Sequence, residues 1–184
     1  MTWCGRSPVR RAPEPVEIRP ARPEDWTQIW PFFRAILAAG ETYAYPADLT
    51  ADQAQAAWTP GRDGQTVVAE EGDRVLGAAL MQPNRPGRGA HVATASFMVS
   101  PAASGRGVGR QLGRYALSWA TAQGFRAMQF NAVVETNTAA VHLGSPSGSR
   151  PSASFPRRST RRRTAWWDCW SCTAVCEPAA VRAG

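Results

Sequence analysis

The order of apolar and polar positions along the chain predicts a domain that mixes strands and helices. Alternating or continuous apolar runs predict strands over 16–19, 65–70, 74–82, 91–99 and 125–134. Apolar residues spaced three or four positions apart predict helices over 23–39, 51–58, 107–123 and 136–143. The predicted order is one strand, two helices, three strands, and then helix, strand and helix.

Glycine, proline and capping residues set several of these boundaries. Gly40 and Gly124 are expected to end the first and third helices, because glycine readily adopts the left-handed conformation of a helix C-terminus. Pro31 lies inside the first helical pattern and should kink or divide it, because proline lacks the N–H group that a helix interior needs. Asp48 or Thr50 can cap the second helix.

The segment Ser104-Gly105-Arg106-Gly107-Val108-Gly109-Arg110 combines three alternating glycines with a predicted helix start. Glycines permit backbone conformations that are closed to other residues. The first N–H groups of the following helix have no partner within the helix, and the helix dipole favours negative charge at that end. A strand, a glycine-rich turn and a helix in this order therefore predict a binding site for phosphate.

Two familiar phosphate-binding loops do not fit this segment. A P-loop needs a lysine after its glycines, and none of the 21 basic residues of this chain is a lysine. The dinucleotide pattern G-x-G-x-x-G would need glycine at Arg110 or Leu112, and the next acidic residue is Glu135.

The segment instead resembles the acetyl-CoA loop of the GNAT N-acetyltransferases, written (Q/R)-x-x-G-x-(G/A). Gly107 and Gly109 match its two small positions, whereas Ser104 stands where Gln or Arg is usual. Phe97-Met98-Val99 looks like the strand end before this loop, and Asn137-Thr138-Ala139-Ala140 looks like the N-x-x-A element of the next helix. The resemblance covers residues 16–143. It implies an α+β (α/β) fold, with a mixed, mostly antiparallel sheet flanked by helices.

The resemblance also implies a function: transfer of an acetyl group from acetyl-CoA to a primary amine, by direct attack in a ternary complex. The acceptor would be a small-molecule amine or a protein N-terminus. Loop N–H groups would hold the pyrophosphate, and an N–H of Met98 or Val99 would polarise the thioester carbonyl. The implied cofactor-binding residues are Phe97, Met98, Val99, Ser104, Gly105, Arg106, Gly107, Val108, Gly109, Arg110, Asn137 and Ala140.

The acid–base groups are less well defined by the sequence. Glu41, in the loop after the first helix, is the first candidate for the general base, followed by Glu135 and a water chain to backbone carbonyls. Tyr43 and Tyr45 either line the acceptor pocket or pack under the loop. Many GNAT enzymes carry a tyrosine as general acid four residues after the N-x-x-A alanine, a position that Gly144 holds here.

The composition changes abruptly at residue 144. Ser, Arg, Pro and Gly make up 17 of the 21 residues over 144–164, which cannot bury enough apolar surface to offset chain entropy. The family continues here with a helix end, a G-F turn and two strands, so we expect the C-terminal strands to be missing or replaced. We divide the chain into a disordered leader (1–15), a GNAT-like domain (16–143) and a basic tail (144–184). We interpret the tail as an out-of-frame reading of the gene, with a natural disordered tail as the alternative.

The net charge of +7 resides mainly in this tail. Residues 1–144 hold 14 arginines against 12 acids, and residues 145–184 hold seven against two. A basic tail can bind nucleic acid through phosphate contacts, but no folded reading module accompanies it, so no specific nucleic-acid partner is expected. The spacing Cys169-x-x-Cys172-x-x-x-Cys176 could hold zinc or an iron–sulfur cluster. The surroundings are not domain-like, so no metal is expected.

The remaining expectations concern the setting of the protein. The sequence has no apolar run long enough for a membrane span and no apolar signal-peptide core, which predicts a cytoplasmic protein with its four cysteines as thiols. Two rival functions stay open: a catalytically impaired acetyl-CoA binder, and a nucleic-acid binder that acts through the tail. An incomplete sheet would leave an open edge, which predicts poor solubility or a homodimer.

Overall fold

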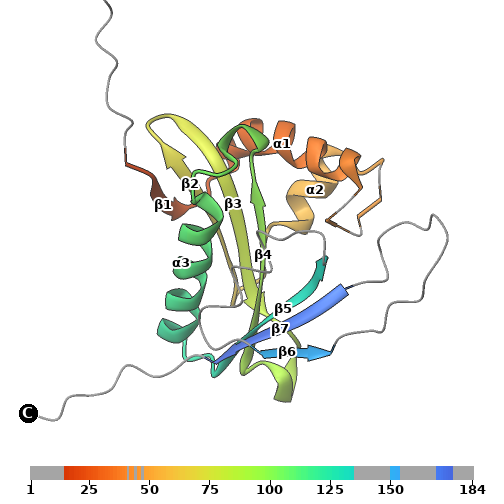
Figure 1. The fold of residues 1–184 in the computed structure, drawn as a ribbon, viewed down its shortest axis with the longest axis vertical. Helices are drawn as coiled ribbons and strands as arrows, with labels where there is room; N and C mark the ends of the chain where they lie inside the picture. Colours follow the sequence, from red (N-terminus) through yellow and green to blue (C-terminus); the bar gives the residue numbers. More distant parts are fainter. Residues whose placement is uncertain are drawn as a thin grey trace, which may run out of the picture.

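The computed structural model describes residues 15–40, 42–43, 45–46, 48–134, 150–153 and 169–175. These residues form one sheet with helices packed on both of its faces (Figure 1). The strands are β1 (Glu17–Pro20), β2 (Gln65–Glu71), β3 (Arg74–Pro83), β4 (Val92–Val99), β5 (Ala127–Val134), β6 (Arg150–Ala153) and β7 (Cys169–Val175).

The sheet has the order β1-β2-β3-β4-β5-β7-β6. Every neighbouring pair is antiparallel except β4 and β5, which run parallel. The parallel pair requires a crossover, which α3 (Val108–Ala122) supplies. The predicted fold class, a mixed and mostly antiparallel sheet flanked by helices, is confirmed.

The strands beyond β5 come from the tail, in line with the expectation that the C-terminal strands are missing or replaced. Two short strands from the tail, β7 and β6, continue the sheet beyond β5. The edge of β5 is therefore paired with β7, and the outer strands of the described sheet are β1 and β6. The sequence did not reveal β6 because Arg150–Ala153 is a Ser/Pro-containing segment without apolar alternation.

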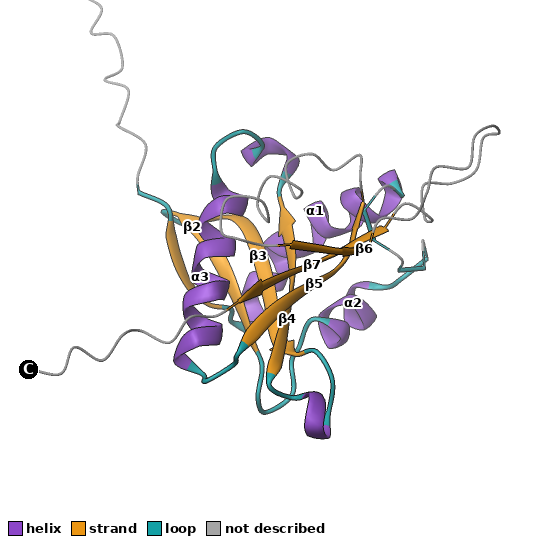
Figure 2. Cartoon of the chain, turned by 60° about the horizontal axis from the view of Figure 1, so that its bottom comes forward, coloured by secondary structure: helices purple, strands orange, loops and turns teal. Residues whose placement is uncertain are grey.

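The helices cover the two faces of the sheet separately, as Figure 2 shows. On one face, α3 buries Val108, Leu112, Ala116 and Ala120 against β3, β4 and β5. On the other face, α1 (Trp26–Ala39) and α2 (Ala51–Ala57) bury a core that includes Ile29, Phe33, Ala54 and Trp58. Short 3-10 turns lie at Pro23–Asp25, Gly87–Gly89 and Pro101–Ala103. The central strand β3 is buried on both sides, which explains its nearly continuous apolar sequence.

The predicted helix boundaries are confirmed where capping chemistry defines them. Gly40 caps α1 in the left-handed region, and Gly124 follows α3 with φ +81°. Thr50 caps α2, because its hydroxyl accepts the backbone N–H of Gln53 at 3.3 Å. Pro31 neither divides nor ends α1, which is one continuous helix. The predicted helix over 136–143 lies outside the described residues.

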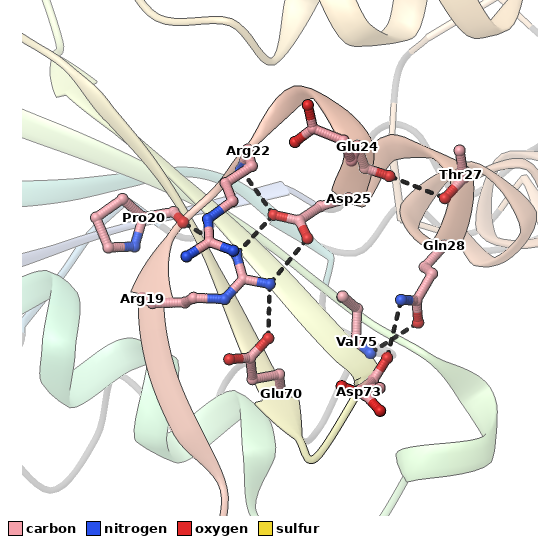
Figure 3. A network of polar contacts seen from close by, with 10 residues as sticks. All are labelled: Arg19, Pro20, Arg22, Glu24, Asp25, Thr27, Gln28, Glu70, Asp73 and Val75. Carbon is pink, nitrogen blue, oxygen red and sulfur yellow. Dashed lines mark hydrogen bonds and ion pairs between the residues drawn. The ribbon is translucent and has the colours of Figure 1, made fainter.

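A partly buried ion pair fixes the start of α1 against the first two strands (Figure 3). Asp25 is only 6% exposed, and its carboxylate accepts two hydrogen bonds from Arg19, at 2.7 and 2.9 Å. The backbone N–H of Arg22 donates a third hydrogen bond at 2.7 Å, and Arg19 also pairs with Glu70 of β2 at 2.6 Å. These bonds hold the pKa of Asp25 below its usual value, with the hydrogen bond from Arg19 as the main cause.

Candidate functional site

Strands β4 and β5 pair over only three residues and then separate. Val92, Ala93 and Thr94 pair with Ala127, Met128 and Gln129, and no pairing is recorded between the two strands beyond that point. Figure 1 shows the two strands diverging toward their C-terminal ends. Among the residues that the structure describes, the C-terminal half of β4 therefore has β3 on one side and no strand partner on the other.

The register of β4 shows which of its peptide groups face this unpaired side. The N–H of Ser100 donates to Leu76, and the carbonyl of Val92 accepts from Asn84. Antiparallel strands exchange hydrogen bonds at every second pair, so the peptide groups of Met98 are directed at Ala78 of β3. The N–H and C=O groups of Phe97 and Val99 consequently point toward the gap between β4 and β5.

The glycine-rich loop lies directly after β4 and before α3. Gly105 and Gly107 have φ angles of +74° and +77°, a region that costs other L-residues roughly 1–2 kcal/mol. A Cβ atom added at either glycine would meet nothing within 4 Å. The glycines are thus needed for their backbone conformation and not because a side chain would clash with a neighbour.

Loop N–H groups and the first turn of α3 provide the donors. The first hydrogen bond inside α3 runs from Gln111 to Gly107, so the N–H groups of Val108, Gly109 and Arg110 have no partner within the helix. The N-cap residue is Gly107, which has no side chain to cap this helix end. The N–H of Arg106 differs, because it donates to Ala103 at 3.3 Å within the turn. The residues present therefore fit a phosphate group at the start of α3.

The two arginines of the loop have different surroundings. The guanidinium of Arg106 pairs with the carboxylate of Glu71, at the end of β2, at 2.5 Å. Arg110 is exposed in the first turn of α3. Arg106 therefore ties the loop to the β2–β3 hairpin rather than pointing freely into solvent. No local sequence pattern points to Glu71, because only the folded sheet brings the hairpin next to the loop.

Two tyrosines approach the unpaired edge of β4 from the loop between α1 and α2. The hydroxyl of Tyr43 donates a hydrogen bond to the carbonyl oxygen of Phe97 at 2.6 Å. The ring of Tyr43 stacks on that of Tyr45, with centroids 5.9 Å apart, and Tyr45 contacts Phe33 in the core. Both tyrosines are partly buried. Tyr45 thus packs on the core of α1, and Tyr43 reaches strand β4 through its hydroxyl.

The structure brings together β4, the glycine-rich loop and Tyr43, but it does not cover every candidate. Phe97 and Val99 are partly buried, Met98 is fully buried, and Ser104 is exposed. The remaining candidates, namely Glu41, Glu135, Asn137 and Ala140, lie outside the described residues.

A separate hollow of about 490 Å³ lies at the other end of α3. Its lining includes Arg62, His91, Trp119 and Phe125, and none of the glycine-loop residues. Among the residues that the structure describes, no three His, Cys, Asp or Glu side chains gather as a metal site would require. Within the same ranges, every helix is too short or too polar to cross a membrane.

Comparison with known proteins agrees with this geometry. The sequence model of the acetyltransferase (GNAT) family matches residues 26–144. The N-acetyltransferase aca1 of Schizosaccharomyces pombe is 35% identical over 85 residues, which cover 46% of this chain and 41% of that protein.

Solved structures extend the likeness to most of the chain. A GCN5-related N-acetyltransferase from Kribbella flavida is 48% identical, with a TM-score of 0.79, over 87% of this chain and 97% of its own. A phosphinothricin acetyltransferase from Sinorhizobium meliloti, solved in complex with acetyl-CoA, is 20% identical with a TM-score of 0.74, over 92% and 93% of the two chains. The second likeness shows a shared fold alone.

The family match covers residues 26–144, which include the glycine-rich loop and strand β4. The chain belongs to the acetyltransferase (GNAT) family.

Proposed function

We propose that this chain is an N-acetyltransferase that moves an acetyl group from acetyl-CoA to a primary amine by direct attack in a ternary complex. The observation that carries the proposal is the open N–H array at the start of α3 next to the unpaired edge of β4. Bound acetyl-CoA would supply an activated thioester. The acceptor would be a small-molecule amine or a protein N-terminus.

Different residues of the site would bind different parts of acetyl-CoA. The N–H groups of Val108, Gly109 and Arg110 would bind the pyrophosphate. The N–H of Phe97 and the peptide groups of Val99 would pair with the pantetheine amides, because the carbonyl of Phe97 accepts from Tyr43. The N–H of Val99 faces the gap and is therefore the better candidate to polarise the thioester carbonyl, because the N–H of Met98 is directed at β3. Asn137 and Ala140 would lie along the pantetheine arm, as their family positions imply.

The attacking amine must lose its proton to a base. We propose Glu41, which directly follows the α1 cap Gly40 and stands two residues before Tyr43 at the edge of β4. Glu135, directly after the end of β5, is the second candidate. Gly144 at the family's tyrosine position favours a variant proposal, in which acetyl-CoA binds but turnover is slow.

A calorimetric titration with acetyl-CoA, followed by a screen of primary amines for release of free thiol, tests the proposal. The screen should include amino acids, amino-acid amides, polyamines, aromatic amines and short peptides. We expect saturable binding and amine-dependent thiol release. Binding of acetyl-CoA without turnover of any amine would contradict the acetyltransferase proposal and support the impaired acetyl-CoA binder. Lack of acetyl-CoA binding would contradict both proposals.

We also propose that residues 16–143 are the acetyl-CoA-binding unit and that residues 144–184 arise from a shifted reading frame. The family match ends at residue 144, where the composition changes. Translation of the coding DNA in its other two frames should yield a helix end, a G-F turn and two strands. If neither frame does so, the tail is a natural extension.

The ion pair between Arg106 and Glu71 leads to a prediction about acetyl-CoA affinity. Arg106→Ala and Glu71→Gln should each weaken acetyl-CoA binding about two- to fivefold, because each loosens the loop and a partly exposed pair contributes about 1 kcal/mol or less. The double variant should bind acetyl-CoA with about the same affinity as the single variant that binds it less tightly. If Arg106 instead bound phosphate directly, Arg106→Ala would weaken binding and Glu71→Gln would not.

A further inference from the structure

Tyr43 and the glycine-rich loop approach strand β4 from opposite faces of the sheet. The loop leads into α3, which packs on one face, whereas Tyr43 packs with the core of α1 and α2 on the other. Its hydroxyl nevertheless contacts the carbonyl of Phe97, on the unpaired edge of β4. Tyr43 therefore stands where a molecule approaching from the α1–α2 face would meet that edge.

The hydrogen bond fixes what the hydroxyl can do next. A phenol has one O–H donor and can also accept hydrogen bonds. In this structure the only proton of the hydroxyl is donated to Phe97 at 2.6 Å, so the oxygen has only accepting capacity left. Burial raises the pKa of Tyr43, which keeps the phenol protonated and the arrangement intact at neutral pH.

We propose that the hydroxyl oxygen of Tyr43 binds the acceptor amine by accepting one of its N–H groups, an inference that rests on the proposed function. An oxygen that can only accept a hydrogen bond favours a ligand that donates one, and the N–H group of an amine is such a donor. The nitrogen lone pair takes no part in this hydrogen bond and stays available for attack. The contact with Phe97 places the oxygen beside the peptide groups of Phe97 and Val99, where we have located the thioester.

The rings behind Tyr43 hold it in this position. Tyr43 stacks on Tyr45, and Tyr45 contacts Phe33, which is fully buried. Aromatic pairs of this kind favour a fixed geometry. The hydroxyl of Tyr43 is thus preorganised at the strand edge before any amine arrives.

Tyr43→Phe tests the inference, because it keeps the ring and removes only the oxygen. With the primary amine that gives the fastest thiol release in the screen above, we expect KM for the amine to rise about tenfold. The calorimetric Kd for acetyl-CoA should stay within about twofold of the unaltered chain. Tyr115→Phe, which removes the same atom from α3, is the matched control and should change neither quantity.

The outcomes separate this inference from the function on which it rests. An unchanged amine KM in Tyr43→Phe, with acetyl-CoA binding retained, would overturn the inference alone. A rise in the acetyl-CoA Kd as large as the rise in amine KM would also overturn it, because that pattern indicates a structural role. Absence of acetyl-CoA binding or of amine turnover by the unaltered chain would overturn the proposed function together with the inference.

Discussion

Replacing Gly107 by valine should raise the Kd for acetyl-CoA about 10- to 100-fold. Gly107 has φ +77°, and a β-branched residue does not tolerate that conformation, so the loop must rearrange. The rearrangement turns the N–H groups of Val108 and Gly109 away from a common point. Each hydrogen bond to a charged group contributes about 1.5–3 kcal/mol, so losing one or more of them produces an effect of this size. Calorimetric titration measures it.

Gly124→Val is the matched control for this substitution. Gly124 has φ +81°, and a Cβ there would also meet nothing within 4 Å, but it lies at the opposite end of α3. Both variants should lose a similar amount of stability, roughly 1–2 kcal/mol in urea unfolding. Only the Gly107 variant should lose acetyl-CoA affinity. Equal affinities in the two variants would show that the loop conformation does not matter for binding.

Replacing Asp25 by asparagine should lower the free energy of unfolding by about 2 kcal/mol at pH 7. The carboxylate accepts three hydrogen bonds from Arg19 and Arg22 while only 6% exposed, and asparagine cannot satisfy them all. For a domain with a stability of about 5–15 kcal/mol this is a large share. Urea unfolding followed by circular dichroism measures the loss.

The effect of this substitution should depend on pH. The folded-state pKa of Asp25 is lowered from the ordinary value of 3.8, so the stabilisation is complete above that value and disappears as the pH falls through the lower folded-state pKa. The difference between the unaltered chain and the variant should therefore shrink below about pH 4. Glu24→Gln removes an exposed neighbouring charge and should change stability little. A difference that stays constant with pH would contradict the assigned role of the ion pair.

Much of the fold could be predicted from the sequence because local patterns determine it. The spacing of apolar residues predicts α1, α3 and the first five strands within three residues of their ends, and Gly40 and Gly124 end the helices as expected. The expected division of the first helix at Pro31 is wrong, because the packing of Ile29 and Phe33 against the sheet holds one helix through this position. Strand β6 carries no such pattern and could not be found in this way.

The glycine-rich loop was also recognisable from the sequence, but its surroundings depend on long-range pairing. Whether Met98 or Val99 has a free N–H depends on the register of β4 against β3, which no local pattern encodes. The partners of Arg106 and Tyr43, namely Glu71 and the carbonyl of Phe97, lie 35 and 54 positions away along the chain. Contacts of this range appear only when the sheet is assembled.

The central claim is that loop amides at the start of α3 and the free edge of β4 together hold acetyl-CoA. Amide-resolved NMR titration of the isotope-labelled chain with acetyl-CoA tests it most directly. The account predicts the largest shifts at the N–H groups of Val108, Gly109, Phe97 and Val99, and little change at Met98, which is bonded to β3. Saturating acetyl-CoA that leaves these amides unmoved, or that shifts residues around Gly124 and Phe125 instead, would contradict the account.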